Sequence, residues 1–318
     1  MKVDRSGKTY SEIRSPGIVA TAKGTLLRYC ECRRASSDWA DIDIKISRSD
    51  DVGKSWNTVS IIESEGNTLN NPVMMVEGDR IVFLYCRNYR ELYCSVSIDD
   101  GVSFSEPRHI SLEDKADFFF SVVAVGPGHG IVHGGRLIVP IWFAANKDDP
   151  RAHAPSFIST LYSADGGENW QIGEIIFPEK LCNPSECALA VSAEGDIVIS
   201  IRNENPERCR ALARSRDGVS LWHSFRFEPK LTDPICMGSM THREGRIYHS
   251  NCDSDCVREN LCIKISDDCF ETIERIHVSD KGGYSDIALV GDELCVLYEK
   301  KNADNRYELH FDKMLIKP

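Results

Sequence analysis

The 318-residue sequence predicts an all-β fold. Its apolar residues gather in short runs, mostly about four to eight residues long, which are rich in β-branched and aromatic side chains and end at Gly, Asp, Asn or Pro. No long stretch shows the period of a helix. The predicted strands lie within Gly17–Tyr29, Ile42–Ser47, Arg80–Cys86, Leu92–Ile98, Arg136–Phe143, Ile197–Arg202 and Glu293–Glu299. Because no linker-like stretch interrupts them, we expect one domain over residues 1–318.

A repeated octet marks turns between these strands. Ser49–Trp56, Ser97–Phe104 and Ser163–Trp170 all follow the pattern S-x-D-x-G-x-x-(W/F). Ser215–Trp222 keeps the Ser, Asp and Trp but shifts the Gly, and Ser266–Ile273 keeps only the Ser and the Asp. In such an octet the Asp can accept hydrogen bonds from its own loop, the Gly allows a positive φ, and the aromatic residue can pack between sheets. We interpret all five copies as structural hairpin turns.

The spacing of the octets predicts the architecture. Their first residues are 48, 66, 52 and 51 positions apart. A period of about 50 residues fits one four-stranded antiparallel blade of a β-propeller. The octets therefore predict a propeller in which each repeat builds one blade.

Composition and charge exclude several classes of partner. The composition, 42% hydrophobic and 27% charged, is that of a globular protein. A net charge of −11 argues against a nucleic-acid partner, which would require a basic surface. The polar N-terminus has no apolar signal-peptide core, and no run approaches the roughly 18 apolar residues of a membrane helix. We therefore expect a cytoplasmic protein with no membrane partner, or a secreted one if the sequence is trimmed.

The 13 cysteines predict neither a disulfide framework nor a metal site. An odd number cannot pair fully within one chain, and the spacings are irregular. The densest group, Cys252, Cys256, Cys262 and Cys269, lacks the C-x-x-C pairs of a structural zinc site. We expect free thiols, no metal and no cofactor.

The octets resemble the Asp-box of sialidases (neuraminidases), and the resemblance extends over nearly the whole chain. Other segments that resemble motifs of this superfamily are Ile13–Pro16, Glu31–Arg33, Gly126–Gly130, Asn183–Glu186, Gly283–Asp286 and Leu297–Glu299. The resemblance implies a six-bladed propeller, in which N- and C-terminal strands together form the closing blade. It also implies a glycoside hydrolase that acts on sialylated glycans or oligosaccharides.

The resemblance implies that three arginines bind the substrate carboxylate. Arg14 opens this triad, although Ser15 stands where the family motif has Ile. Arg202 matches the second arginine at the end of a strand, and Arg258 matches the third, ahead of the fifth octet. Converging guanidinium groups would bind the carboxylate of a sialic acid through charge-assisted, partly bidentate hydrogen bonds.

The resemblance also implies a tyrosine nucleophile, Tyr284, and a glutamate base, Glu186. A carboxylate nucleophile would be repelled by the carboxylate of the substrate, whereas a neutral phenol would not. The phenol has a pKa of about 10, so it needs a base to take its proton. Sialidases with a Tyr nucleophile are the established exception to catalysis by two carboxylates.

Asp38, five residues after Arg33, matches the acid/base of the family, and Asp41 remains the alternative. It would protonate the leaving oxygen and then deprotonate the attacking water. Arg33 or Arg34 would brace Glu31 or bind the acetamido side of the substrate.

Trp39 and Met237 either line the substrate pockets or belong to the core. The predicted function is a retaining exo-α-sialidase that releases terminal sialic acid through a tyrosyl-enzyme intermediate. The alternatives are a sialidase-like hydrolase for a different sugar and a glycan-binding propeller without catalysis.

Overall fold

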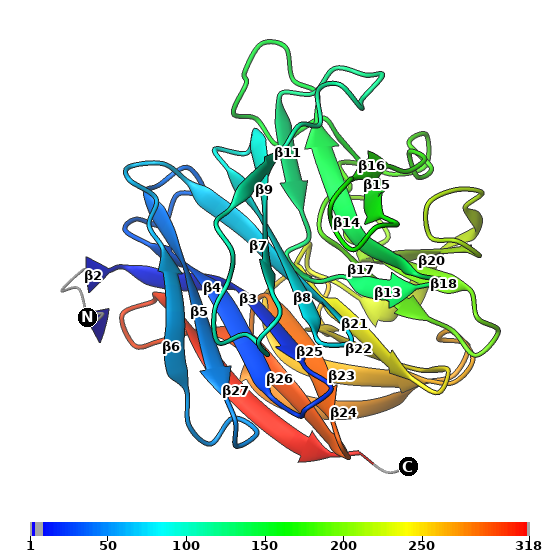
Figure 1. The fold of residues 1–318 in the computed structure, drawn as a ribbon. Coiled ribbons are helices and arrows are strands. Elements are labelled where there is room, and N and C mark those ends of the chain that lie inside the picture. The colour runs from blue at the N-terminus through cyan, green and yellow to red at the C-terminus, as the bar shows by residue number, and fades with distance from the viewer. Residues whose placement is uncertain (1, 4–8, 317–318) are drawn as a thin grey trace.

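The structure is a computed structural model that describes residues 2–3 and 9–316, and within them it contains strands but no helix (Figure 1). Six sheets stand around a common axis as the blades of a β-propeller. The predictions of an all-β class and of six blades are confirmed. The described residues accordingly include no helix that could cross a bilayer.

The first three blades follow the chain from the N-terminal side. Blade one contains β3 (Glu12–Ala20), β4 (Leu26–Arg33), β5 (Ile42–Ser49) and β6 (Asn57–Ile62). Blade two contains β7 (Leu69–Glu77), β8 (Arg80–Arg87), β9 (Glu91–Ser97) and β10 (Arg108–Ile110), with β12 (Gly128–His129) added parallel to β7. Blade three contains β11 (Val122–Val125), β14 (Arg136–Ala144), β15 (Ser156–Ser163) and β16 (Gln171–Ile172), and β13 (Ile131–His133) also pairs with β14.

The last three blades complete the ring. Blade four contains β17 (Cys187–Val191), β18 (Ile197–Ile201), β19 (Cys209–Ser215) and β20 (His223–Thr232). Blade five contains β21 (Ser239–Arg243), β22 (Arg246–Cys252), β23 (Glu259–Ser266) and β24 (Glu274–Lys281). Blade six contains β25 (Ser285–Val290), β26 (Glu293–Lys301) and β27 (Tyr307–Leu315).

The sixth blade differs from the prediction of a blade shared between the two chain ends. It has three strands, all from the C-terminal part of the chain. The N-terminal strands β1 (Lys2–Val3) and β2 (Thr9–Tyr10) pair with each other, and β3 pairs with β4 in blade one. Blades one and six are therefore joined by side chains and packing, because β3 already forms the inner strand of its own blade.

The octets form the predicted turns, each leading from the third strand of its blade. In all five the Ser hydroxyl donates to the Asp carboxylate at 2.8–3.0 Å. The copy that begins at Ser266 lacks the Gly, yet it keeps the same bond. Its Phe270 takes a φ of 73° at the position where Gly53 has 82° and Gly101 has 76°. The side-chain bonds therefore preserve the turn even where the glycine is missing.

Asp286 of β25 joins four strands that surround the axis. Its carboxylate accepts hydrogen bonds from the Ile18 amide of β3 at 2.7 Å and from the Ser239 hydroxyl of β21 at 2.5 Å. It also lies 2.7 Å from Nδ1 of His129 in β12. Burial lowers the pKa of His129, but the Asp286 carboxylate outweighs this effect, so the pKa is raised. One buried carboxylate thus connects blades one, two, five and six.

We predict that Asp286→Ala strongly destabilises the protein. The change leaves the donors of Ile18, Ser239 and His129 without their acceptor in the interior, so we expect a loss of about 3–5 kcal/mol in the free energy of unfolding. Urea denaturation followed by tryptophan fluorescence measures this loss. Asp79→Ala is the control, because the Asp79 side chain is 78% exposed and the change removes a surface contact with Lys23 at 3.8 Å. Equal stability of the two variants would contradict this account of ring closure.

The octet carboxylates predict a loss of stability in acid. Hydrogen bonds from the residue four positions later lower the pKa of Asp51, Asp99, Asp165 and Asp268 to about 2. Because these pKa values are lower in the folded state, the stability they contribute is present above about pH 4 and is lost as the pH falls through 2. The melting temperature should fall over this range, and less steeply in Asp165→Asn. If the melting temperature falls equally steeply with pH in the variant and in the wild type, this contribution of the octet carboxylates is contradicted.

Candidate active site

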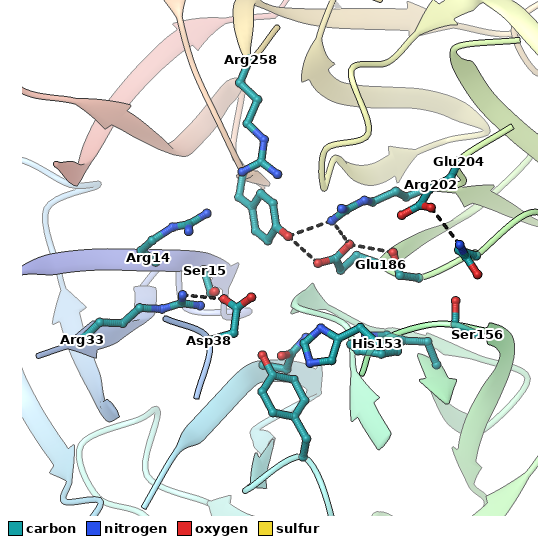
Figure 2. Close-up of a pocket in the computed structure, with 16 residues that line it drawn as sticks. Arg14, Ser15, Arg33, Asp38, His153, Ser156, Glu186, Arg202, Glu204 and Arg258 are labelled. Atoms are coloured by element: carbon teal, nitrogen blue, oxygen red, sulfur yellow. Dashed lines mark hydrogen bonds and ion pairs between the residues drawn. The ribbon is translucent and has the colours of Figure 1, made fainter. Parts of the chain in front are cut away.

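One pocket of about 190 Å³ receives side chains from all six blades (Figure 2). Its walls are Arg14, Ser15, Arg33, Asp38, Asn71, Tyr89, Trp142, His153, Ser156, Asn183, Ser185, Glu186, Arg202, Glu204, Arg258 and Tyr284. Most of them lie at strand ends or in the loops that follow. The propeller therefore brings together groups that are up to 270 residues apart in the chain (Arg14 to Tyr284).

The three arginines predicted to form a triad surround the ring of Tyr284. Their guanidinium carbons lie 5.5 Å (Arg14), 6.0 Å (Arg202) and 5.2 Å (Arg258) from its centroid. Glu299 of β26 holds Arg14 in a bidentate ion pair, with N–O distances of 3.0 and 3.1 Å. This cluster of cations is suited to bind a carboxylate.

Tyr284 and Glu186 lie in direct contact. The phenol donates a hydrogen bond of 2.5 Å to Oε1 of Glu186, and Nη1 of Arg202 donates to the phenol oxygen at 2.8 Å. The same nitrogen of Arg202 pairs with Oε2 of Glu186, which also accepts from the Ser185 hydroxyl at 3.0 Å. Tyr284, Glu186, Arg202 and Ser185 thus form one hydrogen-bonded cluster in the pocket.

The protonation states in this cluster follow from burial and charge. Burial alone would raise the pKa of Glu186, but Arg202 and the hydrogen bonds lower it to about 2. Burial and the Glu186 charge raise the pKa of Tyr284 above its usual value, despite the nearby arginines. At neutral pH a neutral phenol therefore faces an ionised carboxylate, which is the arrangement that a nucleophile and its base require.

Asp38 lies across the pocket from this cluster (Figure 2), in the segment between β4 and β5. Its side chain is 50% exposed and accepts a hydrogen bond of 2.6 Å from Nη1 of Arg33. Arg33 also binds Oε2 of Glu31 through Nε at 2.8 Å and Nη2 at 2.5 Å. Glu31 is fully buried, and its Oε1 accepts a hydrogen bond from the backbone amide of Asn71 at 2.9 Å. Glu31 therefore lies behind the wall and braces Arg33.

Asp41, the alternative to Asp38, does not line the pocket. Nη1 of Arg34 lies 2.5 Å from its carboxylate, which also contacts the Ser64 hydroxyl. Arg34 in turn binds the buried carboxylate of Asp43 at 3.0 Å. The geometry therefore favours Asp38 for any role at a substrate.

Trp39 and Met237 do not line the pocket either. The Trp39 ring packs on Tyr89, with the ring centroids 5.0 Å apart. Met237 is 1% exposed. It packs against Gly128 of β12 so closely that a Cβ added to Gly128 would lie 2.8 Å from the Met237 methyl carbon. Both side chains belong to the packing around the pocket.

Several wall residues were not predicted from the sequence, among them Asn71, Tyr89, Ser156 and Glu204. They match no motif. Their only sequence signal is a position at or near the end of a strand. Asn71, with a φ of 53°, lies at the irregular register of β7 and β8, which turns it toward the pocket.

Comparisons with known proteins identify the family and the fold. A model of the BNR repeat-like domain family matches residues 16–296. A sialidase of Bacteroides fragilis is 27% identical over 96% of this chain and 63% of that protein. A Hadza microbial sialidase has a similar structure, with a TM-score of 0.82 and 24% identity over 96% of this chain and 66% of that one.

The sialidase of Trypanosoma rangeli, solved with 2,3-difluorosialic acid as a covalent intermediate, is also similar. Its TM-score is 0.75 at 19% identity, over 98% of this chain and 55% of that one. At these identities the structural likenesses show the fold. The chain spans about two thirds or less of the length of these three relatives.

Proposed function

We propose that this chain, which belongs to the BNR repeat-like domain family and is similar to a sialidase of Bacteroides fragilis, is a retaining exo-α-sialidase. It releases terminal sialic acid from glycoconjugates or sialo-oligosaccharides. The observation that carries the proposal is the contact of the Tyr284 phenol with the ionised Glu186, within reach of three arginines.

The arginines orient the substrate. A sialic acid carries its carboxylate on the anomeric carbon, the atom at which the bond breaks. Arg14, Arg202 and Arg258 bind this carboxylate around the Tyr284 ring, so the anomeric carbon comes close to the phenol oxygen. This positioning turns the attack into an intramolecular step.

In the first step the phenol oxygen of Tyr284 attacks the anomeric carbon while its proton passes to Glu186. The glycosidic bond breaks, and Asp38 gives its proton to the leaving oxygen. The products are the free aglycone and a covalent intermediate in which the anomeric carbon is bonded to the phenol oxygen of Tyr284 as an aryl ketoside. Arg33 stabilises Asp38 once it has become a carboxylate.

In the second step Asp38 takes a proton from water, and the resulting hydroxide attacks the anomeric carbon. The bond to Tyr284 breaks, and the phenol regains its proton from Glu186. Two displacements at one carbon retain its configuration. The cycle ends with Tyr284 and Asp38 protonated and Glu186 ionised, as it began. The proton that Asp38 gave to the aglycone has been replaced by one from water.

The position of Asp38 supports catalysis over simple glycan binding. A glycan-binding propeller would need the arginines but no acid beside the leaving group. Asp38 lines the same pocket as Tyr284 and Glu186, with its carboxylate half exposed. It is therefore accessible to a glycosidic oxygen.

We predict that Tyr284→Phe abolishes turnover of 4-methylumbelliferyl α-sialoside. Removal of the nucleophile should lower kcat by at least about 100-fold. Fluorophore release by wild type and variant measures it, and a melting curve checks that both are folded. Tyr162→Phe is the matched control, because its hydroxyl contacts Gln171 and lies outside the pocket wall. A Tyr284→Phe enzyme as active as this control would refute the assigned nucleophile.

The proposal also predicts the stereochemistry of the product. Proton NMR recorded during hydrolysis of an α-sialoside should show the α-anomer of free sialic acid first, followed by slow mutarotation to the β-anomer. Retention requires the two-step path through an intermediate. Initial appearance of the β-anomer would exclude that path.

A further inference from the structure

The segment that carries Asp38 is held by hydrogen bonds at Ala40 and Asp41 and only weakly at Asp38 itself. Between β4 and β5 the Ala40 amide donates to the Ser37 carbonyl at 3.1 Å, and the Trp39 amide donates to the Ser37 hydroxyl at 3.1 Å. The Ala40 carbonyl accepts from the Thr68 hydroxyl at 2.5 Å, and the Asp41 carbonyl accepts from the backbone amide of Arg34 at 3.1 Å. The Asp38 carboxylate is held only by Arg33 among the hydrogen bonds of the described residues. A half-exposed ion pair is a weak constraint. It is also absent whenever Asp38 carries the proton that it must deliver.

Trp39, the next residue, is anchored by other blades. Its ring lies 5.0 Å from the ring of Tyr89, which follows β8 of blade two. On the side of blade three, the His153 ring lies 6.1 Å away and the Arg151 guanidinium lies 5.3 Å from the Trp39 centroid. His153 is itself packed on Tyr89 and Trp142, at 4.8 and 5.2 Å. The indole is therefore held between two blades.

The loop 145–155, which supplies Arg151 and His153, is internally braced. The Asn146 side-chain oxygen accepts from the amides of Asp148 and Asp149 at 3.0 and 2.9 Å. Its amide nitrogen donates to the Ala154 carbonyl at 2.9 Å, and the Asp149 carboxylate accepts the Arg151 amide at 2.9 Å. These bonds fix the backbone that presents Arg151 to the indole.

We propose that Trp39 and Arg151 are positioning residues, and that loop 145–155 of blade three places the acid/base Asp38 of blade one by holding its neighbour. The proposal rests on the proposed role of Asp38. Neither Trp39 nor Arg151 lines the pocket, so both act through Asp38 and not through contact with substrate. An acid that is displaced by even about 1 Å loses much of its catalytic effect.

The dependence of rate on the leaving group tests this proposal. A sialyl-lactose releases a basic sugar alkoxide and needs the proton of Asp38, whereas a 4-nitrophenyl α-sialoside releases a stabilised phenolate. The parameter to compare is kcat/KM, because it reports only the steps through formation of the glycosyl-enzyme. For Arg151→Ala we expect about a tenfold loss of kcat/KM on sialyl-lactose and less than about a twofold loss on the aryl substrate.

Three further variants serve as a reference, a rescue and a control for Arg151→Ala. Asp38→Ala should show the same leaving-group pattern with a larger loss, of at least about 100-fold on sialyl-lactose. Arg151→Lys keeps a cation over the indole and should restore most of the rate. Arg28→Ala is the matched control, because it removes a guanidinium 4.2 Å from the Trp56 ring, outside the pocket, and should leave both rates unchanged.

Equal losses on the two substrates, or no loss on either, would overturn the proposal. Hydrogen exchange provides a second readout that needs no turnover. The amides of residues 37–41 should exchange faster in Arg151→Ala than in Arg28→Ala, and unchanged protection would also overturn it. If the wild type hydrolyses neither substrate, the proposed function fails, while the exchange experiment still decides whether the loop holds this segment.

Discussion

The site depends on three arginines in the pocket wall, each of which pairs with a buried glutamate. Arg14 pairs with Glu299, Arg33 with Glu31, and Arg202 with Glu186. A buried charge without a partner would cost several kcal/mol, so each pair can exist only where both members arrive together. In each pair the glutamate fixes the arginine and leaves part of its guanidinium directed toward the pocket. The charged walls are thus held before any ligand binds, which is what electrostatic catalysis requires.

The propeller satisfies this requirement because it closes into a ring. Glu186 and Tyr284 belong to blades four and six, and the pair of Arg14 and Glu299 joins blade one to blade six. Asp286, two residues after Tyr284, ties β25 to the strands around it. The same closure that stabilises the fold therefore places the nucleophile. The octet turns lie elsewhere in the blades and contribute stability without entering the pocket.

The fold could be predicted from the sequence because its main signal is local. The octets encode their turns in hydrogen bonds within a few residues, and even the copy without Gly follows the rule. The sequence also placed Arg14, Arg202, Arg258, Glu186 and Tyr284, because the segments around them resemble family motifs, and the structure brings these residues together in one pocket. Their catalytic roles remain proposals.

Features that depend on tertiary packing could not be predicted in the same way. Nothing in the local sequence decides that Trp39 turns toward Tyr89 or that Met237 lies in the core. The choice between Asp38 and Asp41 follows from Arg34 and Ser64, which draw Asp41 away from the pocket. The prediction of the closing blade was wrong in which strands form it. The pairing of β3 with β4 in blade one shows this, and it depends on tertiary structure that the local sequence does not encode.

The most direct test of the account is covalent trapping of the nucleophile with 2,3-difluorosialic acid. Electron-withdrawing fluorine slows both steps, so an intermediate should accumulate. The account predicts that the intact mass increases by one sugar residue, that the adduct lies on the peptide containing Tyr284, and that Tyr284→Phe gains none. An adduct on Glu186 or Asp38 would contradict the assignment of the nucleophile, and so would the absence of any adduct in an enzyme that hydrolyses sialosides.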